Sequence, residues 1–303
     1  MTIAATVLMT AYNEERTIAG AIRSLLGQTR GDFELLVVDD GSTDRTGDLV
    51  RGLGDLSRGS GDPRIRLLTL PRNLGRPAAL NAGLAAARAP IIAVMDADDW
   101  SLPRRLEAEI GYLESHPDID VVGSDYVVLD DIRGENYVRV TPKGHDDIVR
   151  SLGLFIPVAH GGVAYRREAV KRVGGYAELP GGIKDLEDLD LWIRLAAAGG
   201  RFASLPEVLH VYRISMATSK FHTIRSHAWR NRDHVSLNLR AIRTLNLPKR
   251  FYLPALARYV YPFLPAPVRR QVRRRPAGVR ERPLTSEEWR AVEAVIAAPE
   301  GGG

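Results

Sequence analysis

The sequence predicts an α/β fold built on a mostly parallel central sheet with helices on both faces. Over the first hundred residues, short β-rich runs alternate with helical patterns, which is typical of parallel strands joined by crossover helices. Two of the runs, residues 35–38 and 91–94, are apolar at every position, as expected for strands covered by helices on both sides. A chain of 303 residues with 45% hydrophobic residues can bury the core that such a fold needs.

The first half of the chain is expected to contain four strands and three helices. The strands are expected at residues 6–10, 33–39, 64–69 and 91–95, and the helices at 14–28, 44–53 and 77–88. Short side chains with an oxygen atom accept hydrogen bonds from the free amides of a helix's first turn. Asn13 is therefore expected to cap the first helix, and Ser42 or Thr43 the second.

After residue 100 the pattern is less regular and ends in a mainly helical extension. A helix, a strand and another helix are expected at residues 103–115, 120–128 and 186–198. Beyond residue 215 there follow a helical stretch at 221–245, a proline- and aromatic-rich run at 252–267, and a last helix. Thr285 and Glu288 predict a capping box at the start of that helix. We therefore expect a first domain over residues 1–215 and a mainly helical extension over 216–303.

The formal net charge of +5 is concentrated in one C-terminal segment. Residues 266–282 contain seven arginines and one glutamate, a net charge of +6, which leaves −1 for the rest of the chain. Clustered arginines bind phosphates of any kind, so a solvated tail, a nucleic-acid contact and a membrane contact are the alternatives. Aromatic residues precede the arginines, at positions 252, 259, 261 and 263, and this combination suits an anionic membrane surface. We expect no nucleic-acid partner.

The sequence also restricts the environment of the protein and the ligands of any metal. It contains no cysteine, so disulfides and thiolate ligands are excluded, and a metal must be bound by oxygen or imidazole. Residues 1–9 have the pattern of a first strand, without a basic leader, and no stretch approaches the roughly 18 apolar residues that span a bilayer. We expect a cytoplasmic protein, with peripheral contact at the inner face of the membrane as an alternative.

Acidic residues follow the expected strands at the points where these strands end. In an open parallel sheet, ligands bind beyond the carboxyl ends of the strands. Residues 96–99 (Asp-Ala-Asp-Asp) follow the fourth strand directly, which places several carboxylates in one loop. A divalent cation would relieve their repulsion, and a few oxygen ligands with room for phosphate suit Mg²⁺ or Mn²⁺ better than Zn²⁺. A solvated acidic loop is the alternative interpretation.

Other residues at the strand ends have both a binding and a structural interpretation. Asp39 and Asp40 end the second strand, where one can cap the next helix while the other faces the crevice, or both can be capping and turn residues. Tyr12 can stack on a nucleotide base and Thr10 can bond to it, or both can pack. Arg76 can meet a diphosphate or be solvated.

Glu187 and Asp188 stand at the start of the helical pattern of residues 186–198. Acidic residues in a first turn suit the helix dipole whether or not they take part in chemistry. A carboxylate at such a position, facing a nucleotide crevice, can also act as a general base on a hydroxyl group.

Five segments of the chain carry a family resemblance. They are residues 7–15, 37–44, 73–75 with Asn81, 95–99, and 187–191. In this order and spacing they resemble the motifs of family 2 glycosyltransferases, which have the GT-A fold. The resemblance covers residues 4–215 and says little about the last third of the chain.

The resemblance implies roles for the matching residues. Thr10, Tyr12 and Asp40 match residues that bind the base and ribose of the donor nucleotide, and Asp188 matches the general base. The loop with Asp96 and Asp98 matches the one that holds a metal on the diphosphate. Together with the residues singled out above, the candidates are: catalytic, Asp188; nucleotide-binding, Thr10, Tyr12, Asp40, Arg76 and Asp96; metal-binding, Asp98 and Asp96; sugar or acceptor pocket, Gly161, Gly162 and Glu187.

The implied activity is inverting transfer of a single sugar from a nucleoside-diphosphate sugar to a hydroxyl acceptor, such as a glycan or a lipid-linked acceptor. An aspartate can accept from N3–H of uracil or thymine, which favours a UDP- or dTDP-sugar. Many members have a histidine soon after a Tyr-Arg pair, whereas this chain has Ile214 and Ser215 after Tyr212 and Arg213, with His210 as a substitute. The Gln-x-x-Arg-Trp signature of processive members is missing. A nucleotidyltransferase and a non-catalytic binding protein are the alternatives.

Overall fold

The computed structural model describes residues 3–55, 61–179, 186–215, 224–260, 263–265, 268 and 280–297. Its strands are β1 Ala5–Ala11, β2 Phe33–Asp39, β3 Ile65–Thr69, β4 Ile91–Asp96, β5 Trp100–Ser101, β6 Val121–Asp130, β7 Glu135–Val140, β8 Ala164–Arg166, β9 Phe202–Ile214 and β10 Arg280–Arg282. Its helices are α1 Ile18–Leu26, α2 Thr46–Gly54, α3 Arg76–Ala86, α4 Arg105–Ser115, α5 His145–Ser151, α6 Arg167–Arg172, α7 Glu187–Ala197, α8 Ile224–Thr244, α9 Tyr252–Val260 and α11 Ser286–Ile296.

These strands form one mixed sheet in the order β10-β7-β6-β8-β4-β1-β2-β3, with β9 beside β6 and β5 beside β9. Strands β1 to β4 run parallel, which confirms the predicted parallel sheet of the first hundred residues. The later strands pair antiparallel, apart from β9, which runs parallel to β6. In the parallel part, Thr10 of β1 lies beside Val38 of β2 and Asp96 of β4, so the three strands end at the same edge.

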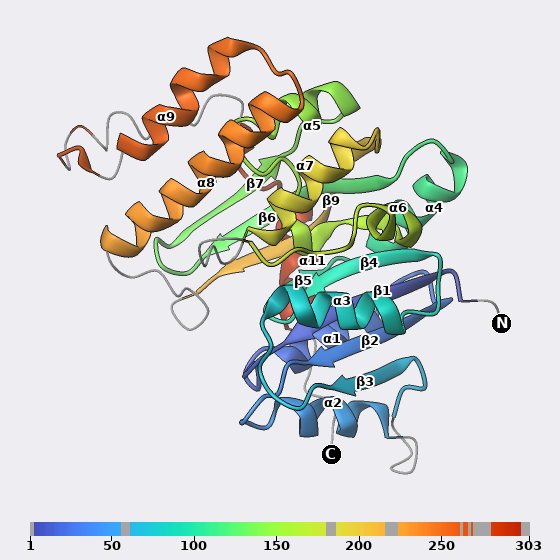
Figure 1. Ribbon diagram of the computed structural model, residues 1–303. Helices are drawn as coiled ribbons and strands as arrows, with labels where there is room; N and C mark the ends of the chain where they lie inside the picture. The colour runs from blue at the N-terminus through green and yellow to red at the C-terminus, as the bar shows by residue number, and fades with distance from the viewer. Residues whose placement is uncertain are drawn as a thin grey trace.

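Helices cover both faces of the sheet, as predicted. Residues Leu8 and Leu36 point to one face, where they pack with α3, α7 and α8, whereas Val7 and Leu35 point to the other, where they pack with α1 and α4. Figure 1 shows α3 and α1 on opposite sides of β1. Successive side chains of a strand thus point to opposite faces of the sheet, and both faces are buried. This explains why these strands are apolar at every position.

The predicted caps of the first two helices are wrong. Helix α1 begins at Ile18, four residues after the predicted start, and Asn13 instead adopts a left-handed conformation with φ 58°. The Asn13 Oδ1 atom accepts a hydrogen bond from the Thr43 amide at 2.8 Å, and Ser42 Oγ accepts one from the Asn13 amide at 3.0 Å. These side chains therefore join two loops to each other. The capping box of Thr285 and Glu288 at the start of α11 is confirmed.

The division at residue 215 stays a prediction, and parts of the extension pack against the sheet. Helix α8 lies within the predicted helical stretch, and Arg280–Arg282 adds β10 to the edge strand β7. Val292 of α11 packs on Val127, Val138 and Val211. Most of the basic segment 266–282 lies outside the described residues. In the part of the chain that is described, no helix is both long and apolar enough to span a membrane.

Candidate functional site

The loop after β2 uses both of its aspartates to hold backbone. Asp39 Oδ1 accepts from the Ser42 amide at 2.9 Å, and Asp40 accepts from the amides of Leu74 and Gly75 at 2.8 and 2.9 Å. Gly41 between them has φ +70°, and a Cβ there would lie 2.5 Å from the Arg72 carbonyl carbon, so only glycine fits. The structure thus favours the turn interpretation of both carboxylates, and it ties the β2 loop to the loop before α3.

Arg76 joins the carboxylate loop to the start of α7. Its NH2 atom lies 2.5 Å from Asp96 Oδ1, and its Nε atom lies 2.8 Å from Glu187 Oε1. Burial of Asp96 opposes ionisation, but the charge of Arg76 outweighs it and holds the Asp96 pKa below its ordinary value. Three predicted site residues that lie up to 111 positions apart in the chain are therefore held together by one guanidinium group.

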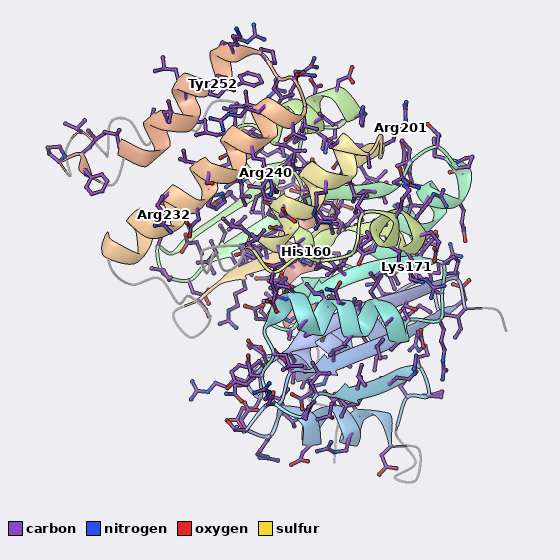
Figure 2. All side chains as sticks on the ribbon, viewed as in Figure 1. His160, Lys171, Arg201, Arg232, Arg240 and Tyr252 are labelled. Atoms are coloured by element: carbon purple, nitrogen blue, oxygen red, sulfur yellow. The ribbon has the colours of Figure 1, made fainter. Side chains whose placement is uncertain are left out.

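His160 adds a buried hydrogen-bonded chain that the sequence interpretation missed. His160 Nδ1 lies 3.0 Å from Arg76 NH2, and its Nε2 lies 2.9 Å from the Tyr176 hydroxyl, which contacts the Tyr165 hydroxyl at 3.0 Å. A guanidinium group only donates, so Nδ1 is the acceptor and Nε2 carries the proton. Burial and the charge of Arg76 lower the His160 pKa to about 3, so the ring is neutral. The signal in the sequence was its position directly before Gly161. Figure 2 shows His160 at the centre of the molecule.

His210 lies beneath the carboxylate loop. Its Nε2 atom shares a hydrogen bond of 2.9 Å with Asp99 Oδ2, and the Arg213 amide donates to Asp99 Oδ1 at 2.9 Å. Burial, with the charge of Arg105, lowers the pKa of His210 to about 3. The side chain is completely buried, so it supports the loop from below; a direct contact with substrate, considered from the sequence, finds no support in this position.

Gly161 and Gly162 allow the backbone to approach this loop closely. A Cβ atom on Gly161 would lie 2.9 Å from Asp96 Oδ2 and 3.1 Å from Asp99 Oδ2. A Cβ atom on Gly162 would lie 3.0 Å from the His210 ring. Gly161 therefore packs against the carboxylate loop and Gly162 against His210, and a larger residue at either position would have to displace that neighbour.

Asp98 is the carboxylate of the loop that lacks a partner. Among the described residues, its side chain makes no hydrogen bond or ion pair with another residue, although it is half-buried. Burial and the charges of Asp99 and Asp96 raise its pKa to about 7. A divalent cation would remove this repulsion, so Asp98 and Asp96 are suited to hold such a cation. The described residues contain no group of three acidic or histidine side chains arranged to hold a metal by themselves, so phosphate and water oxygens would complete the set.

Asp188 lies in the first turn of α7 next to this cluster. Burial and the charge of Glu187 raise its pKa to about 7, although its own Oδ1 accepts from the Leu189 amide at 2.7 Å. Glu187 of this turn is paired with Arg76, and Asp190, its third acid, is buried, with ion pairs from its two oxygens to Arg194 and Arg240. Among the described residues, Asp188 is therefore the acid of this turn that has no ion pair with an arginine.

Thr10 and Tyr12 lie at the carboxyl end of β1, as the sequence predicted. Thr10 is half-buried in the register position beside Asp96, and Tyr12 exposes 43% of its surface.

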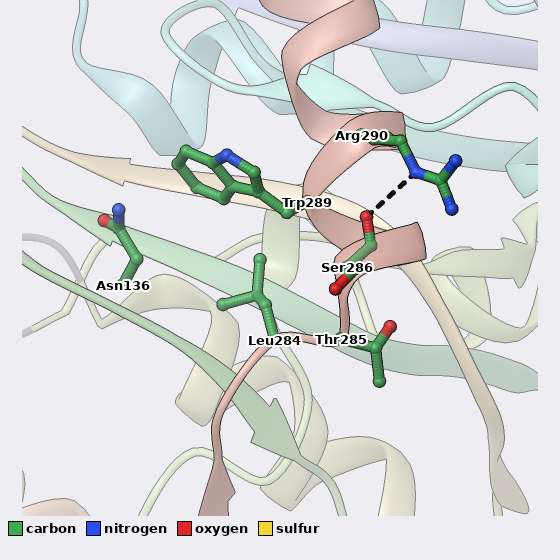
Figure 3. A pocket seen from close by; sticks show the side chains of 6 residues that line it. All are labelled: Asn136, Leu284, Thr285, Ser286, Trp289 and Arg290. Atoms are coloured by element: carbon green, nitrogen blue, oxygen red, sulfur yellow. Dashed lines mark hydrogen bonds between the residues drawn. The ribbon is translucent and has the colours of Figure 1, made fainter.

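A pocket of about 550 Å³ lies away from these residues, between β7 and the start of α11 (Figure 3). Its lining, which includes Asn136 and Trp289, contains none of the predicted site residues.

Replacing Arg76 by alanine should lower the free energy of unfolding by about 1–3 kcal/mol, because Asp96 and Glu187 would lose their shared cation. Urea denaturation measures this loss. Arg51 is the matched control, since its ion pair with Asp48 is solvent-exposed and its removal should cost at most about 0.5 kcal/mol. Equal losses in both variants would show that the Arg76 contacts contribute no more than a surface pair.

Comparison with known proteins places the chain in a family. The sequence model described as "Glycosyl transferase family 2" matches residues 6–174. Among relatives, EpsE of Bacillus subtilis (strain 168), which is named as a glycosyltransferase, is 34% identical over 262 residues, covering 86% of this chain and 90% of that protein. The amylovoran biosynthesis glycosyltransferase AmsE of Erwinia amylovora is 31% identical over 205 residues, covering 67% and 73%.

Solved structures agree on the fold. S. aureus TarS 1–349 in complex with UDP-GlcNAc aligns with a TM-score of 0.59 and 19% identity, covering 86% of this chain and 72% of that one. The mannosyltransferase PcManGT from Pyrobaculum calidifontis, in complex with GDP-Man and Mn²⁺, aligns with a TM-score of 0.58 and 22% identity, covering 100% and 76%. The family match argues against the alternative that the protein is a nucleotidyltransferase. The chain is a glycosyltransferase of GT-A fold and belongs to glycosyltransferase family 2.

Proposed function

We propose that this enzyme transfers a single sugar from a nucleoside-diphosphate sugar to a hydroxyl acceptor, with inversion at the anomeric carbon. The observation that carries the proposal is the ion-paired bridge from Asp96 through Arg76 to Glu187. This bridge holds a carboxylate loop suited to a diphosphate and its cation beside Asp188, a carboxylate suited to proton abstraction. A single displacement needs both groups and no covalent intermediate.

In the proposed mechanism, Asp188 accepts the proton of the acceptor hydroxyl while the oxygen of that hydroxyl attacks the anomeric carbon and the bond from this carbon to the diphosphate breaks. A cation held by Asp98 and Asp96 would supply positive charge for the departing diphosphate. Arg76 keeps Asp96 ionised, and the neutral His160 accepts a hydrogen bond from the same Arg76 NH2 atom that pairs with Asp96. Gly161 and Gly162 let the backbone pack closely against Asp96 and His210, which helps to fix the carboxylate loop in place.

For the donor we propose a UDP- or dTDP-sugar. The complex of the similar TarS structure with UDP-GlcNAc supports this choice, whereas that of PcManGT with GDP-Man points to a guanosine donor. Asp40 contributes less than the sequence suggested, because it already accepts two backbone amides. For the acceptor we propose a glycan or a lipid-linked sugar, since AmsE is named for amylovoran biosynthesis.

The experiment that tests this function measures release of nucleoside diphosphate from a panel of UDP-, dTDP- and GDP-sugars with Mn²⁺ or Mg²⁺. Release from one class of donor, with inverted configuration of the product by NMR, is the expected result. A product with retained configuration would reject the single displacement. Absence of turnover with every donor, in a protein that binds them in a thermal-shift assay, would favour the non-catalytic alternative.

The pH dependence of the reaction should report Asp188. A base must be unprotonated to act, and the Asp188 pKa is raised to about 7. We therefore expect kcat/KM to fall about tenfold per unit as the pH decreases below 7, and to level off above it. Stopped assays from pH 5 to about 9 measure the profile. A rate constant that is flat down to pH 5 would mean that no group with this pKa acts as the base.

A further inference from the structure

Helix α9 exposes an apolar surface at the outer side of the molecule. Among the described residues, Leu253, Leu256 and Val260 of α9 expose 77%, 47% and 53% of their surfaces, and Phe263, three residues beyond the helix, exposes 65%. We call these four residues the α9 patch. The other exposed large hydrophobic residues are spread over distant elements, apart from Val268 nearby. An apolar surface concentrated in one short segment indicates a contact with another apolar phase.

The geometry of α9 explains why these side chains are left exposed. The helix packs on α8 through Ala255, which contacts the cluster of Ile242 and Leu247. Positions 253, 256 and 260 fall on the opposite stripe, because three and seven residues correspond to about one and two helical turns. Every exposed side chain of α9 that the structure describes is apolar. Figure 1 shows α9 at the edge of the fold, beyond α8 and away from the sheet.

The chain that leads into and out of the α9 patch carries charges of one sign, and the exposed acids Asp146 and Asp147 of α5 lie on the element that packs with Phe251 and Tyr252. Residues 234–280 contain ten arginines and one lysine, without any aspartate or glutamate. Arg243, Lys249 and Arg250 are exposed in the chain that leads into α9, and the guanidinium group of Arg250 lies 5.6 Å from the centre of the Phe251 ring. An apolar stripe bordered by basic residues is the pattern of helices that lie in the interface of an anionic bilayer.

We propose that the α9 patch inserts into the surface of an anionic lipid bilayer, with the neighbouring basic residues at its headgroups. A second copy of this chain fits the patch less well, because it would bring two segments of the same strong positive charge together. Nucleic acid would engage the basic residues but leave the apolar stripe in water. The contact expected from the sequence consisted of the basic segment 266–282 and the aromatic residues before it, and the exposed apolar stripe of α9 adds a part that enters the bilayer.

The test compares vesicle binding of full-length variants. Wild type, Leu253→Glu/Leu256→Glu and Ile132→Glu/Ile296→Glu are sedimented with vesicles of phosphatidylcholine alone or mixed with phosphatidylglycerol. Ile132 and Ile296 are exposed by 44% and 43% and lie outside α9, so the control variant has the same change in net charge and in exposed apolar residues. We expect the α9 variant to bind the mixed vesicles about tenfold more weakly than the control, because two charged side chains replace its inserted ones.

Further outcomes separate this proposal from its rivals. Wild type should bind the mixed vesicles more tightly than pure phosphatidylcholine, and salt should weaken the binding. Equal binding of the α9 and control variants, or equal binding of wild type to both vesicles, would overturn the proposal. A wild-type dimer that the α9 variant makes monomeric, without vesicle binding, would identify a second copy as the partner instead. Release of nucleoside diphosphate by the same variants tests the proposed function separately, since the α9 patch lies outside the site.

Discussion

Replacing Asp188 by asparagine is expected to lower the transfer rate by ~10²-fold or more while donor affinity stays nearly unchanged. Asparagine keeps the shape of the side chain and its place in the first turn of α7, but it cannot accept the acceptor's proton. Single-turnover rates measure the chemical step, and a thermal-shift titration with the donor measures binding. The acidic limb of the pH profile should disappear in the same variant, because the group with a pKa of about 7 is gone.

Two neighbouring acids provide the controls. Glu187→Gln should reduce the rate less, since Glu187 acts through Arg76. Asp190→Asn should act mainly on stability, because Asp190 pairs with Arg194 and Arg240. If Asp188→Asn retains near-normal transfer while Asp190→Asn does not, the base lies half a turn further along α7. If both remain active, a mechanism with one carboxylate base is wrong for this protein.

The parallel half of the fold was predictable because its information is local. Residues such as Leu35 and Val37 lie in apolar runs that permit only a buried strand, and the chain between these runs has helical periodicity. The position of the site followed from the same logic, since strands that run parallel end at one edge of the sheet. Asp96 and Asp40 were therefore placed near each other without knowledge of any contact.

The rest was not predictable because it depends on partners far away in the sequence. Asn13 is of a residue type that often caps helices, but its side chain accepts a hydrogen bond from the amide of Thr43, 30 residues further on. The 13-residue strand β9 was missed, since its middle contains a proline and an irregular register, with no alternation to reveal it. In the sequence, Arg76 cannot be distinguished from an arginine that is solvated on a loop. Only the fold brings Asp96 and Glu187 close to it. Paired residues of this kind leave no periodic signal.

Replacing Asp98 by alanine is expected to abolish the metal-dependent part of nucleotide binding and to reduce transfer by ~10²-fold or more while the fold stays intact. In the wild type, a nucleoside diphosphate should raise the melting temperature only with Mg²⁺ or Mn²⁺, because Asp96, Asp98 and the diphosphate otherwise repel one another. In the variant, adding the cation should make no further difference.

Asp98 suits this test because its removal costs the fold little. Its carboxylate has no protein partner in the described part of the chain. Burial and the charges of Asp99 and Asp96 oppose its ionisation, which raises its pKa to about 7. Asp98→Ala should therefore melt at or above the wild-type temperature in EDTA, where relief of repulsion is the main effect. Asp96→Ala is the contrasting variant, because it deprives Arg76 of a partner and should melt lower. A wild-type shift with nucleotide that is equally large in EDTA would remove the metal from the mechanism.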